Sequence, residues 1–270
     1  MAIGLGAYSS SVIEVVCAGD AEFMTIQHFL KKVFGLFGIE IRLNRNVAKH
    51  IAHEKSLVWQ RKWELLARQM EIKTVIDVGA NTGQFATMIN QVFPRARIYS
   101  FEPLPDCFSA LVENTAYLEQ VDCKQVALGR EQGVQLFKQT GFSPCSSFLE
   151  PTELLTDQIP AAEQVTELEV QIDTLDHQFS ERSLDSKVLL KLDVQGFEKE
   201  VLLGAAETLK KVDVVVAEVA FAVQYEGQPL FDELNALLRD CGFKYQGNVD
   251  QHLCTQTSQI IEADAIFVKA

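Results

Sequence analysis

The sequence predicts an α/β fold with a doubly wound, mostly parallel sheet behind a short N-terminal helical segment. Short apolar runs alternate with helical patterns from residue 73 onward, which is the pattern of a parallel sheet with helices on both faces. Glycine or acidic residues follow three of these runs. The length of 270 residues and the 47% hydrophobic content fit one large domain with a packed core.

Residues 1–70 are predicted to be a helical cap or extension, and residues 71–270 the main domain. Apolar residues recur at helical spacing from Ile26 to Phe37, and a second helical pattern covers 46–70. The N-terminal part holds 9 basic and 6 acidic residues, whereas the main domain holds 15 and 31. The first helix is predicted to dock on the main domain. The alternative, in which it lies on a membrane surface, stays open.

The main domain is predicted to alternate strands and helices, interrupted once. The first half has strands at 74–79, 97–101 and 125–128, and helices at 83–93 and 105–118. An insertion at 134–182 holds two strand-like pieces, 134–138 and 167–172. The second half has strands at 188–193 and 214–219, helices at 197–211 and 229–241, and terminal strands at 243–246 and 265–268. The order of these elements allows an antiparallel last strand.

The first strand runs into a glycine-containing loop, where a ligand is expected at the carboxyl end of the sheet. The predicted cofactor-binding residues of this loop are Asp77, Gly79, Ala80, Asn81, Thr82 and Gly83. Its two glycines let the backbone turn sharply and approach a ligand closely. The loop lacks the Gly-x-Gly-x-x-Gly spacing of a pyrophosphate site, so a ligand with an adenosine and no pyrophosphate fits better. S-adenosylmethionine (SAM) is such a ligand; a tight turn without a ligand is the alternative.

A carboxylate ends the second predicted strand. Glu102 follows Gly79 by 23 positions and precedes Pro103. A carboxylate about 20 residues beyond a glycine loop can accept hydrogen bonds from both ribose hydroxyls. Glu102 and Pro103 are therefore predicted to belong to the cofactor site, and the alternative for Glu102 is an ordinary exposed side chain before a turn.

Two charged residues end the strand after the insertion. Strand alternation places Lys191 and Asp193 on one face, with Asp193 at the mouth of the site. A lysine within an apolar strand needs a partner or a function, so Lys191 and Asp193 are the predicted catalytic residues. A purely structural ion pair is the alternative. Glu218, near the end of the next strand, is a second carboxylate candidate.

The joint pattern resembles the FkbM family of SAM-dependent methyltransferases. The matching segments are Val75–Gly83, Phe101–Pro103, Val126–Gly129, Ser146–Leu149, Thr174–Asp176, Leu190–Glu198 and Val201–Ala205. The resemblance implies the Rossmann-like sheet of class I SAM methyltransferases, methylation of a hydroxyl, and cofactor contacts from Gly79, Ala80, Asn81 and Glu102. It further implies that Ala127 lies beside the adenine and that Asp193 faces the methyl-transfer site. The family usually carries a glutamate where this chain has Gln195.

The composition and charge of the chain limit the classes of molecule that it is expected to bind. A main domain this acidic would repel a phosphate backbone, so no nucleic acid substrate is expected. Six scattered cysteines, none at a zinc-binding spacing, suit a reducing cytoplasm. A bound metal is not favoured, because Glu218-Val219 stands where some relatives of the wider fold carry an Asp-Asn pair. Membrane association is not expected. The working hypothesis is a cytoplasmic O-methyltransferase whose small-molecule acceptor is a sugar or a secondary-metabolite hydroxyl. The alternatives are a non-catalytic module that binds SAM or adenosine, and an NAD-dependent oxidoreductase.

Overall fold

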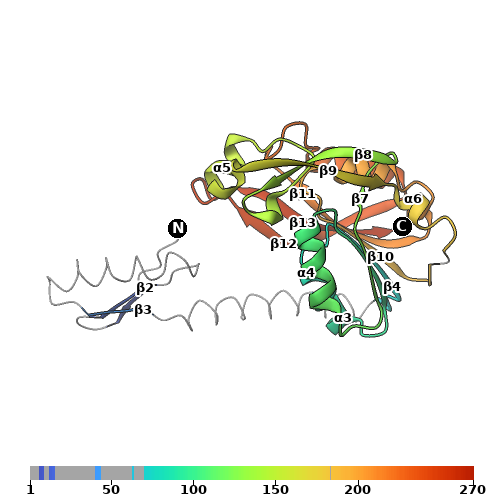
Figure 1. The fold of residues 1–270 in the computed structure, drawn as a ribbon, viewed down its shortest axis with the longest axis horizontal. Helices are drawn as coiled ribbons and strands as arrows, with labels where there is room; N and C mark the ends of the chain where they lie inside the picture. Colours follow the sequence, from blue (N-terminus) through green and yellow to red (C-terminus); the bar gives the residue numbers. More distant parts are fainter. Residues whose placement is uncertain (1–5, 9–11, 16–39, 44–62, 64–69, 183) are drawn as a thin grey trace. The chain divides into compact units, whose positions relative to one another are not determined.

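The computed structural model describes residues 6–8, 12–15, 40–43, 63, 70–182 and 184–270 (Figure 1). The chain divides into two compact units, Met1–Arg61 and Lys62–Ala270. In the first unit, strands β1 (Gly6–Tyr8), β2 (Val12–Val15) and β3 (Glu40–Leu43) form a small sheet in that order, which the sequence analysis did not predict. The predicted helices at 26–37 and 46–70 lie outside the described residues, apart from Trp63 and residue 70. The division into 1–70 and 71–270 stays a prediction.

The second unit is built on a seven-stranded sheet with the order β12-β13-β11-β10-β4-β5-β6. Its strands are β4 (Thr74–Val78), β5 (Arg97–Phe101), β6 (Val121–Lys124), β10 (Val188–Leu192), β11 (Val212–Ala220), β12 (Phe243–Leu253) and β13 (Ile260–Lys269). Strand β13 is antiparallel to both of its neighbours, and the remaining pairs are parallel. The predicted doubly wound, mostly parallel sheet is therefore confirmed. Strand order reverses at β4 and β10, which is where ligands bind in such sheets.

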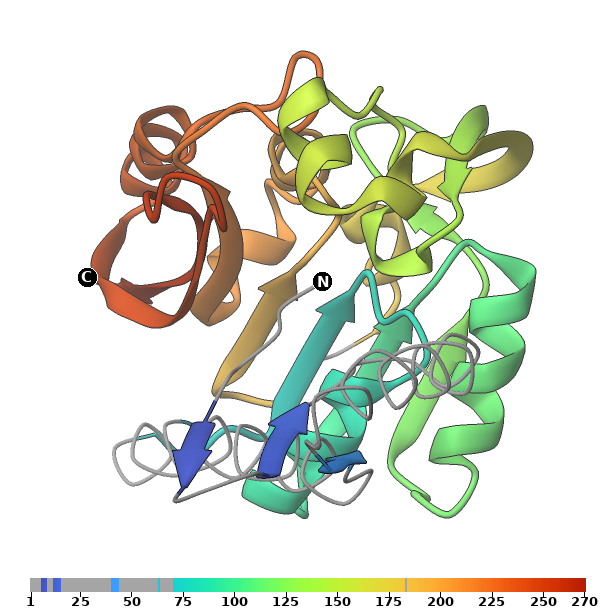
Figure 2. The same ribbon diagram turned by 90° about the vertical axis from the view of Figure 1, so that its left-hand side faces the viewer.

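The predicted insertion forms a second small sheet. Strands β8 (Gly133–Thr140) and β9 (Val165–Asp173) pair in antiparallel fashion, and β7 (Ala127–Leu128) pairs with β9. Between β8 and β9 lie the 3-10 helices η1 (Ser143–Cys145) and η2 (Pro160–Glu163) and the helix α5 (Glu153–Gln158). This yellow-green segment lies over the carboxyl ends of the parallel strands (Figure 2). The insertion thus covers the edge where a ligand is expected.

The remaining helices connect the strands of the large sheet. They are α3 (Gln84–Val92), α4 (Pro105–Thr115), α6 (Leu175–Gln178), α7 (Glu198–Leu203), the 3-10 helix η3 (Thr208–Lys210) and α8 (Phe231–Asp240). Among the helices that the structure describes, none is long and apolar enough to cross a bilayer.

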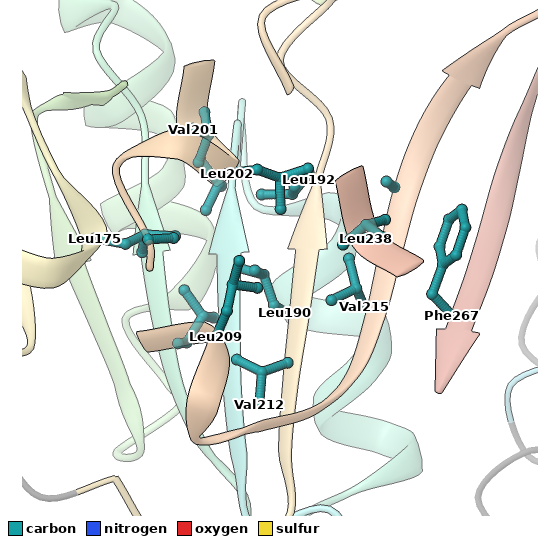
Figure 3. Packing of buried hydrophobic residues seen from close by; sticks show 14 of the residues in the cluster. Leu175, Leu190, Leu192, Val201, Leu202, Leu209, Val212, Val215, Leu238 and Phe267 are labelled. Atoms are coloured by element: carbon teal, nitrogen blue, oxygen red, sulfur yellow. The ribbon is translucent and has the colours of Figure 1, made fainter. Parts of the chain in front are cut away.

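The apolar core gathers against one face of the strands β4, β10, β11 and β13. Leu190 and Leu192 alternate with Lys191 along β10, and they pack with Val201 and Leu202 of α7 (Figure 3). Because side chains alternate across a strand, the opposite face of β10 carries the lysine. Lys191 therefore lies on the other face of β10, beside the buried Leu189.

Several elements differ from their predictions in position or length, and β12 and β13 extend well beyond the predicted 243–246 and 265–268. The third strand of the sheet is β6, whereas the predicted 125–128 stretch contributes β7 to the other sheet. Strand β6 lies at the sheet edge and is only half-buried, so its sequence lacks an apolar run. The predicted helix 197–211 ends at Leu203. At Gly204 the backbone passes so close to Gly129 that an added Cβ would lie 2.0 Å from the Gly129 carbonyl oxygen.

Candidate active site

The tips of β4, β5 and β10 converge at the carboxyl edge of the sheet. The Gly79 N–H donates to the Phe101 carbonyl at 3.0 Å, and the Asp193 N–H donates to the Val78 carbonyl at 3.1 Å. Gly79 has a φ of +82°, and a Cβ there would lie 1.9 Å from the Asp193 carbonyl oxygen. Only glycine allows this contact, so the glycine in the predicted loop brings two strand tips together.

The backbone amides of the glycine loop are all used within the chain. Those of Gly79 and Ala80 donate to Phe101, and that of Gly83 donates to Ala80. The Thr82 amide donates to the Asn81 side chain. The loop therefore has no free row of N–H groups of the kind that binds a pyrophosphate. Its geometry agrees with the prediction from the missing third glycine.

Glu102 joins the loop to the second strand. One carboxylate oxygen accepts the Asn81 N–H and the other accepts the Leu104 N–H, each at 2.9 Å. Asn81 itself adopts a left-handed conformation with φ +46°. A carboxylate offers about four lone-pair positions, so two positions of Glu102 remain for a ligand. Burial raises the pKa of Glu102 to about 7, although both backbone hydrogen bonds favour the ionised form.

Asp77 lies fully buried at the end of β4. Its Oδ2 atom lies 3.3 Å from the Ser100 hydroxyl, which donates to it. Its Oδ1 atom has no hydrogen-bond partner among the described residues. Burial raises the pKa of Asp77 to about 6, and the nearby Lys191 charge opposes this rise. A buried carboxylate oxygen without a partner is costly, which is typical of a site that another molecule completes.

Lys191 and Asp193 form the predicted pair. The Lys191 ammonium lies 2.7 Å from Asp193 Oδ2 and stands over the Phe85 ring, 5.3 Å from its centroid. Burial works against both charges, but their mutual attraction prevails, so the pKa of Lys191 is raised and that of Asp193 is lowered. The Lys191 side chain is 5% exposed and that of Asp193 is 34% exposed. Asp193 is thus the member of the pair that a ligand can reach.

Gln195 is the residue that the sequence analysis did not place in the site. Its amide nitrogen donates to Asp193 Oδ1 at 3.0 Å and to Glu218 Oε2 at 2.7 Å. The Ser147 hydroxyl donates to the Gln195 carbonyl at 2.7 Å, which attaches the insertion to the site. Gln195 has a φ of +52°, an unusual conformation whose only sequence signal is the following Gly196. Burial and neighbouring carboxylates raise the pKa of Glu218.

Ala127 and Pro103 are the remaining predicted residues of the cofactor site. Ala127 is buried in the same apolar cluster as Leu104, two residues beyond Glu102. Pro103 is half-buried between β5 and α4. Of the insertion serines Ser146 and Ser147, Ser147 bonds to Gln195. Ser146 instead accepts the Thr140 N–H at 3.1 Å, within the insertion.

The fold and the site together define the class of the protein. A sheet with one antiparallel strand next to its edge, a glycine turn after β4 and an acidic residue after β5 are the features of class I methyltransferases. The methyltransferase FkbM domain matches residues 77–245, more than half of the chain. The chain therefore belongs to the FkbM methyltransferase family, as the resemblance predicted.

Three relatives illustrate this membership. The chain is 29% identical over 161 residues to 2-O-methyltransferase NoeI of Sinorhizobium fredii, over 57% of this chain and 66% of NoeI. It is 25% identical over 261 residues to 31-O-demethyl-FK506 methyltransferase FkbM of Streptomyces tacrolimicus, a match that covers 87% of this chain and 86% of that protein. It is 26% identical over 157 residues to hexuronic acid methyltransferase AglP of Haloferax volcanii, a match that covers 57% of this chain and 59% of AglP. The chain thus spans less than two thirds of the length of NoeI and of AglP. Membership of this family does not support the NAD-dependent oxidoreductase alternative.

Proposed function

We propose that this protein uses SAM to methylate a hydroxyl group of a small polar acceptor, such as a sugar or another hydroxylated metabolite. The observation that carries the proposal is the joint placement of Gly79, Glu102 and Asp193 at one strand edge. The names of NoeI and FkbM support an oxygen acceptor, and that of AglP supports a carbohydrate.

Two features of the site fit SAM. The backbone amides of the glycine loop already donate to other groups of the chain, which suits an adenosine ligand without a pyrophosphate. The unpartnered Asp77 oxygen suits a ligand that carries a positive charge or brings ordered water. In this proposal Glu102 accepts hydrogen bonds from the ribose, and the buried Ala127 adjoins the adenine. Asp77, Pro103 and the loop residues complete the surroundings of the cofactor.

The acceptor side of the site is assigned to Asp193. SAM supplies an electrophilic methyl group on a sulfonium when it is bound. Asp193 is kept ionised by Lys191, so it is a strong hydrogen-bond acceptor and a weak base. We assign it the role of holding the acceptor hydroxyl in line for attack. Such a carboxylate can still take the hydroxyl proton once bond formation has made that proton acidic. Lys191 is then a positioning residue, because it acts through Asp193.

Isothermal titration calorimetry with SAM, S-adenosylhomocysteine and NAD tests the cofactor assignment. We expect binding of the first two and none of NAD. Incubation with SAM and a panel of sugars, hexuronic acids and hydroxylated metabolites, followed by mass spectrometry, tests for a transferred methyl group. Absence of SAM binding would refute the proposal, whereas SAM binding without transfer to any acceptor would favour the non-catalytic alternative. The cytoplasmic location stays a prediction.

A further inference from the structure

Three potential metal ligands lie on neighbouring strands beyond Asp193. In the sheet register Ala220 of β11 lies opposite Glu262 of β13, and His252 of β12 also lies opposite Glu262. Glu218 is two positions from Ala220, so alternation places Glu218, His252 and Glu262 on one face of the sheet. Each offers one ligand atom, and these atoms lie within 4.8 Å of one another. This spacing requires only a small contraction to surround one ion.

Side-chain amides hold both carboxylates of this group, and one carboxylate holds the histidine. His252 Nδ1 lies 2.6 Å from Glu262 Oε1, and the Gln224 amide donates to Glu262 Oε2 at 2.5 Å. The Gln195 amide donates to Glu218 Oε2. In the part of the chain that the structure describes, Glu218 Oε1 accepts no hydrogen bond. Amides that hold one oxygen of each carboxylate are the kind of support that metal ligands have.

A fourth carboxylate on this face lacks a partner. Asp264 lies opposite Glu218 in the register and is partly buried. No hydrogen bond or ion pair involves its side chain among the residues described. The Lys191 ammonium acts on Asp264 through its charge, but it is bonded to Asp193. A partly buried carboxylate without a partner, beside a second one with a free oxygen, gives this face a concentration of negative charge that favours the binding of a cation.

We propose that Glu218, His252 and Glu262 bind one divalent metal ion of the Mn²⁺ or Zn²⁺ class. One imidazole and two carboxylates suit these ions, whereas Mg²⁺ and Ca²⁺ prefer oxygen ligands alone. The ion takes the place of the proton shared by His252 and Glu262, and that proton leaves to solvent. The sequence alone does not favour a metal, because Val219 follows Glu218 where a second ligand would be expected. The histidine comes from β12, which only the sheet register brings near.

The ion would lie on the acceptor side of the proposed site. One amide, that of Gln195, connects Asp193 with Glu218. His252 is exposed, so coordination positions not filled by protein remain open to water or to an acceptor oxygen. This placement rests on the proposed function, but the binding of the ion does not.

Metal binding is tested on the full-length chain after treatment with a chelator. MnCl₂ and ZnCl₂ are titrated by calorimetry, and bound Mn²⁺ is followed by electron paramagnetic resonance. We expect one site of either ion that His252→Asn and Glu262→Gln each abolish. Gln224→Ala, which removes only the supporting amide, is expected to weaken binding about 10- to 100-fold.

His177→Asn is the matched control. His177 lies 2.8 Å from Asp173 and is exposed, so it repeats the histidine–carboxylate pair without belonging to a three-ligand group among the described residues. It should bind the ion as the wild type does. No binding by the wild type, or unchanged binding in His252→Asn, would overturn the proposal. Circular dichroism confirms folding of each variant, and SAM calorimetry on the same samples reports separately on the proposed function.

Discussion

Gly79→Ala is the sharpest perturbation of the proposed site. The added Cβ would lie 1.9 Å from the Asp193 carbonyl oxygen, whereas real Cβ contacts are essentially never below 3.0 Å. The tips of β4 and β10 must therefore separate by about 1 Å, a displacement that is enough to disturb a positioned site. The positive φ adds about 1–2 kcal/mol of backbone strain.

The expected result is a weaker cofactor site in a less stable protein. Moving the loop by about 1 Å takes Asn81 and Glu102 out of register with a bound ribose. The loss of one charge-assisted hydrogen bond costs about 1.5–3 kcal/mol, which is about a 10- to 100-fold weaker affinity. Calorimetry with S-adenosylhomocysteine measures the affinity, and urea unfolding measures the stability.

Gly227→Ala separates the two causes. Gly227 has a φ of +78°, close to that of Gly79, but a Cβ there meets nothing within 4 Å. It should therefore lose only the conformational contribution to stability and keep its affinity. An unchanged affinity in Gly79→Ala, together with equal destabilisation in both variants, would refute the inference that the contact of the two strand tips shapes the cofactor site.

Three further predictions concern acidic residues. Glu102→Ala should weaken SAM binding about 10- to 100-fold by calorimetry, because a ribose acceptor is lost; equal affinity would remove Glu102 from the site. Asp193→Asn should leave SAM affinity within about twofold and lower turnover about 100-fold or more, measured with whichever acceptor proves active; full activity would exclude its assigned role. Burial raises the pKa of Glu198 to about 7, so the native state keeps a proton that the unfolded chain loses. The free energy of unfolding should therefore fall between about pH 4.5 and pH 7, by at most about 3 kcal/mol. Glu198→Gln keeps an oxygen for the Val194 and Gly196 amides and should flatten this dependence in urea titrations; an unchanged slope would contradict the assignment.

The central strands could be predicted from the sequence because burial on both faces requires an apolar run. Strand β5 has the predicted bounds, and β4 and β10 each end one residue before theirs. All three contain apolar runs that stop at glycine or acidic residues. The candidate residues of the cofactor site follow from these ends, since parallel strands bring their carboxyl ends to one edge.

Features that depend on pairing between distant segments have no comparable hydrophobic pattern in the sequence. Strand β6 is half-buried and polar at the edge, so no hydrophobic period marks it. The contact between His252 and Glu262 depends on the register of β12 with β13, which contains irregularities. The bond from Ser147 to Gln195 depends on how the insertion folds over the sheet. These features depend on contacts between segments that are distant in the sequence, whereas hydrophobic periodicity carries information on one segment at a time.

Gln195 explains how two carboxylates can share the acceptor side. Asp193 and Glu218 both accept hydrogen bonds from its one amide nitrogen, so their repulsion is moderated by a neutral donor. The Tyr225 hydroxyl lies 2.7 Å from Gln195 Oε1, which fixes the nitrogen toward the carboxylates. A glutamate at this position, as the family pattern has, would place a third negative group there and remove both donated hydrogen bonds. The hydrogen bond from Gln195 therefore helps to keep Asp193 ionised, together with the charge of Lys191.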